Sequence, residues 1–306
     1  MSPSLRRSLC LLVVLPTLAR AQPSSSPQTF ASAQDAADAL VRAVQADDAG
    51  AILSILGPGA RDLLDTGDPV ADKKHREGFA RASKAAWKLV ADPVTPDRFE
   101  LVVGEKEWPF PIPIVKSGGR WRWDTAEGRR EILARRIGRD EITAIEICRA
   151  YLQAQREYAS APRDGTDLRQ YAQHIVSSPG KQDGLYWPTT GNEPESPAGE
   201  IFARMNGEGY TQEKGRPKIF HGYRFRILKA QGRHARGGAR DYVVKGHMIG
   251  GFGLVAFPVQ YGVTGITTFI VNQDGIVYEK DLGPKTVGVA TKMKAYDPSP
   301  SWRPAP

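Results

Sequence analysis

The spacing of apolar residues predicts helices first, then a short extended stretch, a long helical run and an extended C-terminal part. Ser32 followed three residues later by Asp35 is typical of a capped helix start. Apolar residues then recur at helical spacing, at Ala36, Ala37, Leu40, Val41 and Val44. A first helix is therefore expected directly after Ser32.

Two further helices are expected before the pattern changes. Ile52 to Leu56 predicts a short helix that Gly57-Pro58-Gly59 interrupts. Asp68-Pro69 has the order of a cap followed by a first-turn proline, which predicts the start of another helix. Its core face would consist of Phe79, Ala82, Ala86, Trp87 and Val90.

From Arg98 onward the apolar period becomes that of strands. Three strands are expected, at Phe99–Val103, Trp108–Val115 and Arg120–Asp124. The middle one contains Pro109, Pro111 and Pro113, which remove backbone donors from a single edge, so we predict an edge strand. Its apolar face (Trp108, Phe110, Ile112 and Ile114) either covers the helices or forms a rim that faces a ligand.

Thr125 to Ala159 is predicted to be helical with an interruption at Gly138, after which Asp140 caps the second part. We place a domain boundary there. The expected organisation is a signal peptide (1–21), a linker (22–29), an N-terminal α+β domain (30–138), a C-terminal α+β domain (139–290) and a Pro-rich tail (291–306).

The C-terminal half combines a turn-rich connection with sequential strands. Short helices are expected at Leu168–Val176 and Pro197–Met205, and strands follow from Gly222 onward. Asp274-Gly275 predicts a hairpin between the last two strands. The predicted fold class is α+β: helices on a short antiparallel sheet, then a long helix packed on an antiparallel meander.

The first 21 residues have the layout of a secretory signal peptide. Arg6 and Arg7 precede a short apolar run, Leu9–Leu15, and Ala19-Arg20-Ala21 has the small-residue pattern of a cleavage site. We expect an exported protein, periplasmic or extracellular, with no membrane span once the signal is removed. Cys148 would be the remaining cysteine, on the apolar stripe of a helix, which predicts a buried and inert thiol.

The charge balance of the chain does little to narrow the choice of partner. The net charge is +8, and the signal carries three arginines and no acid, which leaves about +5. Basic residues are mostly interspersed with acids, as on a solvated helix face, and no nucleic-acid-binding motif is present. Nucleic acid is therefore not an expected partner.

No motif establishes a catalytic or metal site. Ser178-Pro179-Gly180-Lys181 matches Ser-x-x-Lys only as a string, because Pro-Gly favours a turn where that chemistry needs a helix. His221, His234 and His247 recur every thirteen residues, but no close-spaced ligand pair accompanies them. Catalytic residues stay unknown, and no metal or cofactor is expected.

Several blocks resemble the uncharacterised bacterial family Domain of Unknown Function 2950. They are Trp108–Pro113, Arg135–Gly138, Gly222–Leu228, Gly250–Pro258 and Thr268–Tyr278. The resemblance implies an exported bacterial protein and carries no activity with it. The C-terminal half is also loosely similar to the globular part of pilin-like proteins, although its helix is internal. The N-terminal half is weakly similar to modules of the nuclear-transport-factor-2-like type.

The leading hypothesis is a non-catalytic envelope or periplasmic module that binds a partner protein or envelope polymer, or contributes to assembly. The candidate binding residues are Trp108, Phe110, Tyr223, Arg224, Arg226, His247 and Tyr261. One alternative is a hydrolase-like enzyme with an interdomain site that uses His221 or His247 as base. Another is a binder of anionic cell-wall polymer through Arg224, Arg226, Arg233, Arg236 and Arg240.

Overall fold

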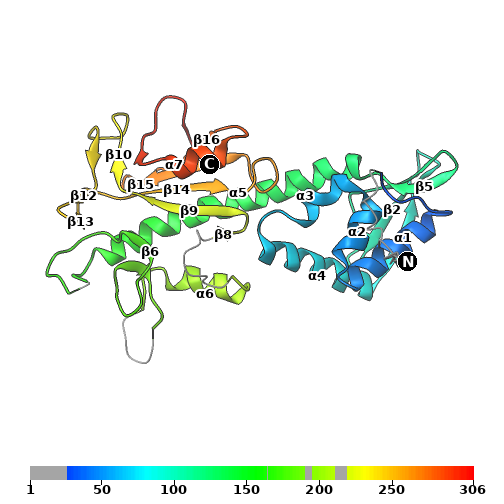
Figure 1. Cartoon of the computed structure of the whole chain (residues 1–306), viewed down its shortest axis with the longest axis horizontal. Coiled ribbons are helices and arrows are strands. Elements are labelled where there is room, and N and C mark those ends of the chain that lie inside the picture. The colour runs from blue at the N-terminus through cyan, green and yellow to red at the C-terminus, as the bar shows by residue number, and fades with distance from the viewer. Residues whose placement is uncertain (1–25, 164, 190–194, 211–218) are drawn as a thin grey trace, which may run out of the picture.

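The computed structural model describes residues 26–163, 165–189, 195–210 and 219–306. The chain forms two lobes, and one long helix, α5 (Thr125–Tyr158), runs through both (Figure 1). We call the elements from α1 to β5 the N-terminal lobe and those from β6 to β18 the C-terminal lobe. The predicted signal peptide lies outside the described residues.

Two helices of the N-terminal lobe, α1 and α4, begin where the sequence predicts. The helices of this lobe are α1 (Ala33–Gln45), α2 (Ala49–Leu56), a short 3-10 turn η1 (Pro58–Ala60), α3 (Arg61–Leu64) and α4 (Pro69–Ala85). The Ser32 hydroxyl accepts from the Asp35 amide at 3.0 Å, and the Asp35 carboxylate accepts from the Ser32 amide at 3.1 Å. This reciprocal pair is the predicted capping box.

These helices pack on an antiparallel sheet. Its strands are β1 (Trp87–Ala91), β2 (Arg98–Val103), β3 (Trp108–Pro109), β4 (Ile114–Ser117) and β5 (Arg120–Trp123), in the order β1-β2-β4-β5 with β3 beside β2. Trp123 is fully buried against α1, where its indole N–H donates to the Ala36 carbonyl at 3.2 Å. The core of this lobe therefore lies between sheet and helices.

The helix expected to continue to Val90 ends five residues earlier. Trp87 to Ala91 form β1, which pairs along its whole length with β2, Trp87 opposite Val103. An aromatic and β-branched segment alternating with Lys88 fits a strand better than a helix end. The ladder with β2 satisfies its backbone groups, so the predicted helical face at Trp87 and Val90 was wrong.

The proline-rich segment is not one continuous edge strand, as we expected, and only its first part, β3, pairs on a single side. It breaks into β3 and β4, both paired with β2, and β4 lies between β2 and β5 inside the sheet. The Phe110 amide still donates to the Leu101 carbonyl, at 2.8 Å. Pro111 and Pro113 have no donors for a continuous ladder, and the chain leaves the sheet between Phe110 and Ile114.

Gly128 of α5 lies against this break. A Cβ at Gly128 would come within 2.5 Å of both the Ile112 Cα and the Pro111 carbonyl oxygen. We expect Gly128→Ala to lower the free energy of unfolding by about 1–3 kcal/mol, because backbone atoms would have to move. Urea denaturation would measure the change.

Gly138→Ala is the matched control, because a Cβ at Gly138 meets nothing within 4 Å. It should raise the free energy of unfolding by roughly 0.5–1 kcal/mol through helix propensity alone. Equal effects at the two glycines would contradict this account of the Gly128 contact.

Helix α5 has 34 residues and continues through Gly138 without the predicted interruption. At 1.5 Å per residue it is about 50 Å long. One interior glycine costs only about 1 kcal/mol, and packing on both sides offsets it. Leu133 is buried in the first half, and Cys148 and Tyr151 in the second. Asp140 is therefore a buried mid-helix residue, not a cap.

The C-terminal lobe contains the expected antiparallel meander, in the order β18-β16-β15-β14-β9-β8. The predicted hairpin at Asp274-Gly275 is present, with β15 paired to β16. The strands of this sheet are β8 (Ile219–Phe220), β9 (Tyr223–Leu228), β14 (Gly253–Pro258), β15 (Thr267–Asn272), β16 (Tyr278–Asp281) and β18 (Arg303–Pro304).

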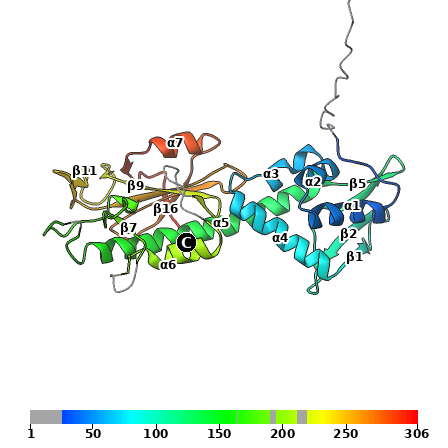
Figure 2. The ribbon, with the colours of Figure 1, turned by 60° about the horizontal axis from the view of Figure 1, so that its bottom comes forward.

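Helices cover both faces of this sheet, as Figure 2 shows with α5 and α7 (Thr286–Lys292) on opposite sides. Leu254 and Phe269 belong to the core beneath α5, whereas Val255 and Ile270 pack with Ala290 of α7. Successive strand residues point to opposite faces, so the continuous apolar runs of β14 and β15 fit a sheet buried on both sides.

Short elements complete the lobe. They are β6 (His174–Val176), β7 (Gly184–Tyr186), α6 (Gly199–Gly207), β10 (Ala230–Gln231), β11 (Arg240–Asp241), β12 (Val243–Val244), β13 (His247–Met248) and β17 (Ala295–Tyr296). Helix α6 lies close to the predicted Pro197–Met205 helix. The helix expected at Leu168–Val176 is wrong, because His174–Val176 pairs in parallel with β7.

Cys148 is fully buried on α5, as predicted, and burial raises the pKa of its thiol to about 12. A thiol with so high a pKa stays protonated and unreactive at neutral pH. Within the described ranges, no helix combines the length and the apolar character needed to cross a membrane.

Candidate functional site

The N-terminal lobe contains an apolar groove of about 490 Å³, within the roughly 300–1,000 Å³ typical of small-molecule sites. Helices α1 to α4 and the start of α5 surround it, together with β2 and the proline-rich segment. Its apolar lining consists of Leu40, Val44, Ile52, Leu56, Leu63, Leu64, Phe79, Ala82, Val103, Trp108, Phe110, Pro111, Ile112 and Ile132. We call this cavity the groove.

The groove exists because α4 packs loosely. Only Asp72 and Ser83 of its 17 residues are buried, and Phe79 and Ala82 face the cavity. Figure 1 shows α4 and the first half of α5 diverging from the lobe junction. Gly78 adds to the open volume, since a Cβ there would meet nothing within 4 Å.

Aromatic rings form one wall of the groove. The Phe110 ring centroid lies 5.1 Å from that of Phe79, 5.7 Å from that of Trp123 and 6.2 Å from that of Trp108. Trp108 is 42% exposed at the edge, whereas Trp123 is buried. The structure thus brings Trp108 and Phe110 together in the lining of the groove, while Ile112 and Ile114 of the same face are fully buried. That this face meets a ligand stays a prediction.

The polar residues of the lining are basic. Lys74, His75 and Arg76 come from α4, and Arg135, Arg136 and Arg139 from α5; the described residues that line the groove include no aspartate or glutamate. The Arg136 guanidinium is buried and donates to the Asp62 and Leu63 carbonyls at 2.8 and 2.9 Å. Burial lowers its pKa.

His75 lines the groove on α4, and its pKa is lowered to about 4 by desolvation and by the positive charges of Arg139 and Arg136. It is therefore neutral near pH 7. The positive charge of the groove comes from the lysine and arginines alone.

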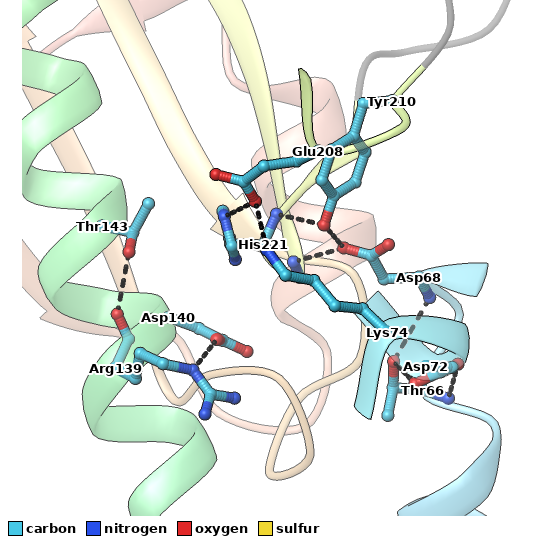
Figure 3. Close-up of polar contacts among 11 residues, drawn as sticks. Thr66, Asp68, Asp72, Lys74, Arg139, Asp140, Thr143, Glu208, Tyr210 and His221 are labelled. Carbon is cyan, nitrogen blue, oxygen red and sulfur yellow. Dashed lines mark hydrogen bonds and ion pairs between the residues drawn. The ribbon is translucent and has the colours of Figure 1, made fainter. Parts of the chain in front are cut away.

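The lobes meet next to the groove, in the cluster drawn in Figure 3. Asp68 is 1% exposed and caps α4 by accepting from the Ala71 amide at 3.1 Å. Its other oxygen accepts from the Tyr210 hydroxyl and the Gly222 amide of the C-terminal lobe, each at 2.9 Å. The Tyr210 oxygen in turn accepts from the His221 amide at 3.2 Å. One carboxylate thus fixes a helix start and joins the lobes.

A second contact across the junction involves Glu208. One of its carboxylate oxygens lies 2.7 Å from the His221 Nε2 atom and 3.3 Å from the Lys74 Nζ atom (Figure 3). Burial lowers the pKa of His221, and the negative charge of Glu208 opposes that effect. Glu208 therefore connects the edge of the groove to the C-terminal lobe.

Asp140 of α5 is a third acidic residue of the junction (Figure 3). It is buried, and the Arg139 Nε atom is 3.5 Å from its carboxylate. Burial raises its pKa to about 7 against the opposing charges of Arg139 and Arg136. A Cβ on Gly222 would lie 3.0 Å from the Asp140 carboxylate, so the glycine permits this close approach.

The described contacts of the junction form a hydrogen-bond network. His221 binds Glu208, but no hydroxyl or thiol donates to its ring in the part of the chain that the structure describes. The predicted histidine series does not come together, since His234 contacts Asp297 and His247 contacts Gln170. Among the described residues, no group of three possible metal ligands occurs.

Three of the predicted binding residues lie on β9, away from the groove. The Tyr223 hydroxyl is buried and donates to the Thr267 carbonyl at 2.8 Å. Arg226 donates to the carbonyls of Ala290 and Met293, at the end of α7. Arg224 is half-buried on the same face. These contacts hold the lobe together and leave Arg226 little freedom to bind a polymer.

The remaining predicted residues lie elsewhere on the C-terminal lobe. His247 is on β13, and the Tyr261 hydroxyl donates to the Asp281 carboxylate at 3.1 Å. Neither lines the groove. The other arginines proposed for polymer binding are exposed in or beside the turn between β10 and β11: Arg233, Arg236 and Arg240.

Sequence reasoning missed the basic edge of the groove. Arg135, Arg136 and Arg139 lie within little more than one turn of α5, close to the groove-lining Ile132. Three arginines at this spacing on one helix, together with the apolar Phe79 and Ala82 on α4, are the pattern from which a basic edge could have been predicted. It was interpreted as a solvated helix face, which is the usual meaning of mixed charge.

Comparison with known proteins identifies the family of the chain. Searches of curated proteins and of solved structures found no match, so the similarities to pilin-like and nuclear-transport-factor-2-like proteins remain predictions. A family model described as "Protein of unknown function (DUF2950)" matches residues 27–305, which is nearly the whole described chain. The chain therefore belongs to the DUF2950 family.

Proposed function

We propose that the chain is a non-catalytic binding protein of the bacterial cell envelope that holds the acyl chain of a single-chain lipid in the groove. The observation that carries the proposal is an open cavity of about 490 Å³ with a mainly apolar lining. The basic, apolar and small-residue order of residues 1–21 supports export to the envelope.

The shape and lining suit such a ligand. Each methylene group that leaves water contributes about 0.8 kcal/mol, and the groove supplies aliphatic walls from α1, α2 and α5 with aromatic rings at one side. The exposed Trp108 marks the edge where a chain would enter. An envelope protein meets lipids routinely, which makes an acyl chain a plausible cargo.

Filling the groove tests the proposal. Gly78 lines it, and a side chain there has open space, so Gly78→Leu should occupy the volume without displacing α4. We expect the variant to bind the uncharged dye Nile red at least about tenfold more weakly than the wild type, since a difference of about 1.4 kcal/mol is a factor of ten. Fluorescence titration of the full chain measures this.

Gly138→Leu is the matched control, because Gly138 is an exposed helical glycine outside the groove. It should bind the dye as the wild type does. Native mass spectrometry of the purified chain should also show a co-purifying lipid that Gly78→Leu lacks. A wild type that binds no dye, or a Gly78→Leu variant that binds it normally, would contradict the proposed function.

A further inference from the structure

The charge distribution around the groove indicates which kind of lipid it accepts. Lys74 comes from α4, and Arg135 and Arg139 come from α5, on the opposite wall. Their side chains are 56%, 54% and 51% exposed. We call these three residues the rim cations. They lie around an apolar cavity whose described lining carries no acid. Each rim cation also contacts one carboxylate outside that lining, from Glu208, Glu131 or Asp140.

The carboxylates that contact the rim cations neutralise them only in part. The Glu208 oxygen near Lys74 lies closer to His221, at 2.7 Å against 3.3 Å. Arg139 has a long contact of 3.5 Å with Asp140, whose buried carboxyl is only partly ionised at neutral pH because its pKa is about 7.

The pair of Arg135 with Glu131 is exposed on one helix face, where such pairs contribute little. An incoming anion can therefore form charge-assisted hydrogen bonds with the rim cations at small cost.

We propose that the groove selects single-chain lipids with an anionic carboxylate headgroup, whose chain enters the cavity while the headgroup binds the rim cations. This inference rests on the proposed function. A guanidinium presents parallel donors that match a carboxylate, and Lys74 adds a point charge from the other wall. Arg136 is not part of the headgroup site, because its donors are bound to the Asp62 and Leu63 carbonyls.

Three ligands of equal chain length separate the headgroup from the chain: laurate, dodecanol and dodecyltrimethylammonium. Each is titrated against the full chain loaded with Nile red. We expect laurate to displace the dye at a concentration about tenfold lower than dodecanol, in line with the strength of charge-assisted bonds. The cationic ligand should be the weakest. Added salt should weaken laurate and leave dodecanol unchanged.

The variant Lys74→Gln/Arg139→Gln should bind laurate about tenfold more weakly and dodecanol normally. Arg130→Gln is the control, since Arg130 is an exposed α5 arginine outside the groove. Arg135→Gln gives a second test if the double variant folds poorly, which its circular dichroism would show. Equal binding of laurate and dodecanol, or an equal loss of both, would overturn the headgroup inference and leave the proposed function standing. Failure of every ligand would overturn both.

Discussion

Asp68→Ala is expected to lower the free energy of unfolding by about 3 kcal/mol or more. Loss of the cap on α4 accounts for about 1 kcal/mol. The Tyr210 hydroxyl and the Gly222 amide would also lose their buried acceptor, and each such loss costs roughly 1–3 kcal/mol. Urea denaturation measures the total, and hydrogen exchange should show faster exchange at the Gly222 amide and the first turn of α4.

Two further variants should lower the free energy of unfolding by less than Asp68→Ala does. Asp65→Ala removes an exposed carboxylate three residues earlier and should change stability by less than about 0.5 kcal/mol. Tyr210→Phe removes one donor to Asp68 and the acceptor of the His221 amide, and should lower the free energy of unfolding by about 1–2 kcal/mol. If Asp68→Ala were as stable as Asp65→Ala, the role of Asp68 in joining the lobes would be refuted.

Asp140→Asn is expected to stabilise the protein increasingly as pH rises. In the folded chain the pKa of Asp140 is about 7, against an ordinary value of 3.8. The folded state therefore holds a proton that the unfolded state loses, and the contribution of Asp140 to stability falls between pH 4 and 7. At about 1.36 kcal/mol per pH unit, the fall approaches about 4 kcal/mol.

The difference in the free energy of unfolding between the Asn variant and the wild type, taken at each pH, isolates the contribution of Asp140. His75 and His221 have lowered pKa values and act in the opposite direction, since they favour unfolding as pH falls. Their contributions are common to both proteins and cancel in the difference. Urea denaturation at pH 4.5, 6 and 8 should show that the free energy of unfolding of the variant, relative to that of the wild type, increases at each step. A difference that stays constant with pH would show that Asp140 does not titrate as described.

Local patterns predicted those parts of the fold that local chemistry determines. The Ser32 capping box, the start of α4 after Asp68 and the hairpin at Asp274-Gly275 depend on residues within a few positions of one another. In each case a nearby polar group or turn residue decides the structure before distant packing contributes.

The errors arose where distant partners decide the structure. Trp87 to Ala91 is a strand because β2 is available to pair with it. Helix α5 continues through Gly138 because both lobes pack on it and offset the intrinsic cost of glycine. Pro111 and Pro113 interrupt the expected strand. Its second part, β4, lies inside the sheet because β5 pairs with its other side.

The candidate site was predictable only in part. Trp108 and Phe110 were singled out from the sequence, since their alternation with prolines marks an apolar face. The cavity itself results from incomplete packing between α4 and α5, and no short pattern reports the space that two helices leave unfilled. Lys74 and Arg139 lie 65 positions apart, so only the folded chain shows that they border one opening.

The continuous helix α5 also constrains how this chain can evolve. Ile132 packs against the core of the N-terminal lobe and Tyr151 belongs to the core of the C-terminal lobe, and both lie on the uninterrupted helix α5. A recombination event that exchanged one half of the gene would join two unrelated halves of helix α5. The new half would pack on its lobe only if its rotation about the helix axis matched that of the old half to within a fraction of a turn. The two halves are therefore expected to be inherited together, as one unit.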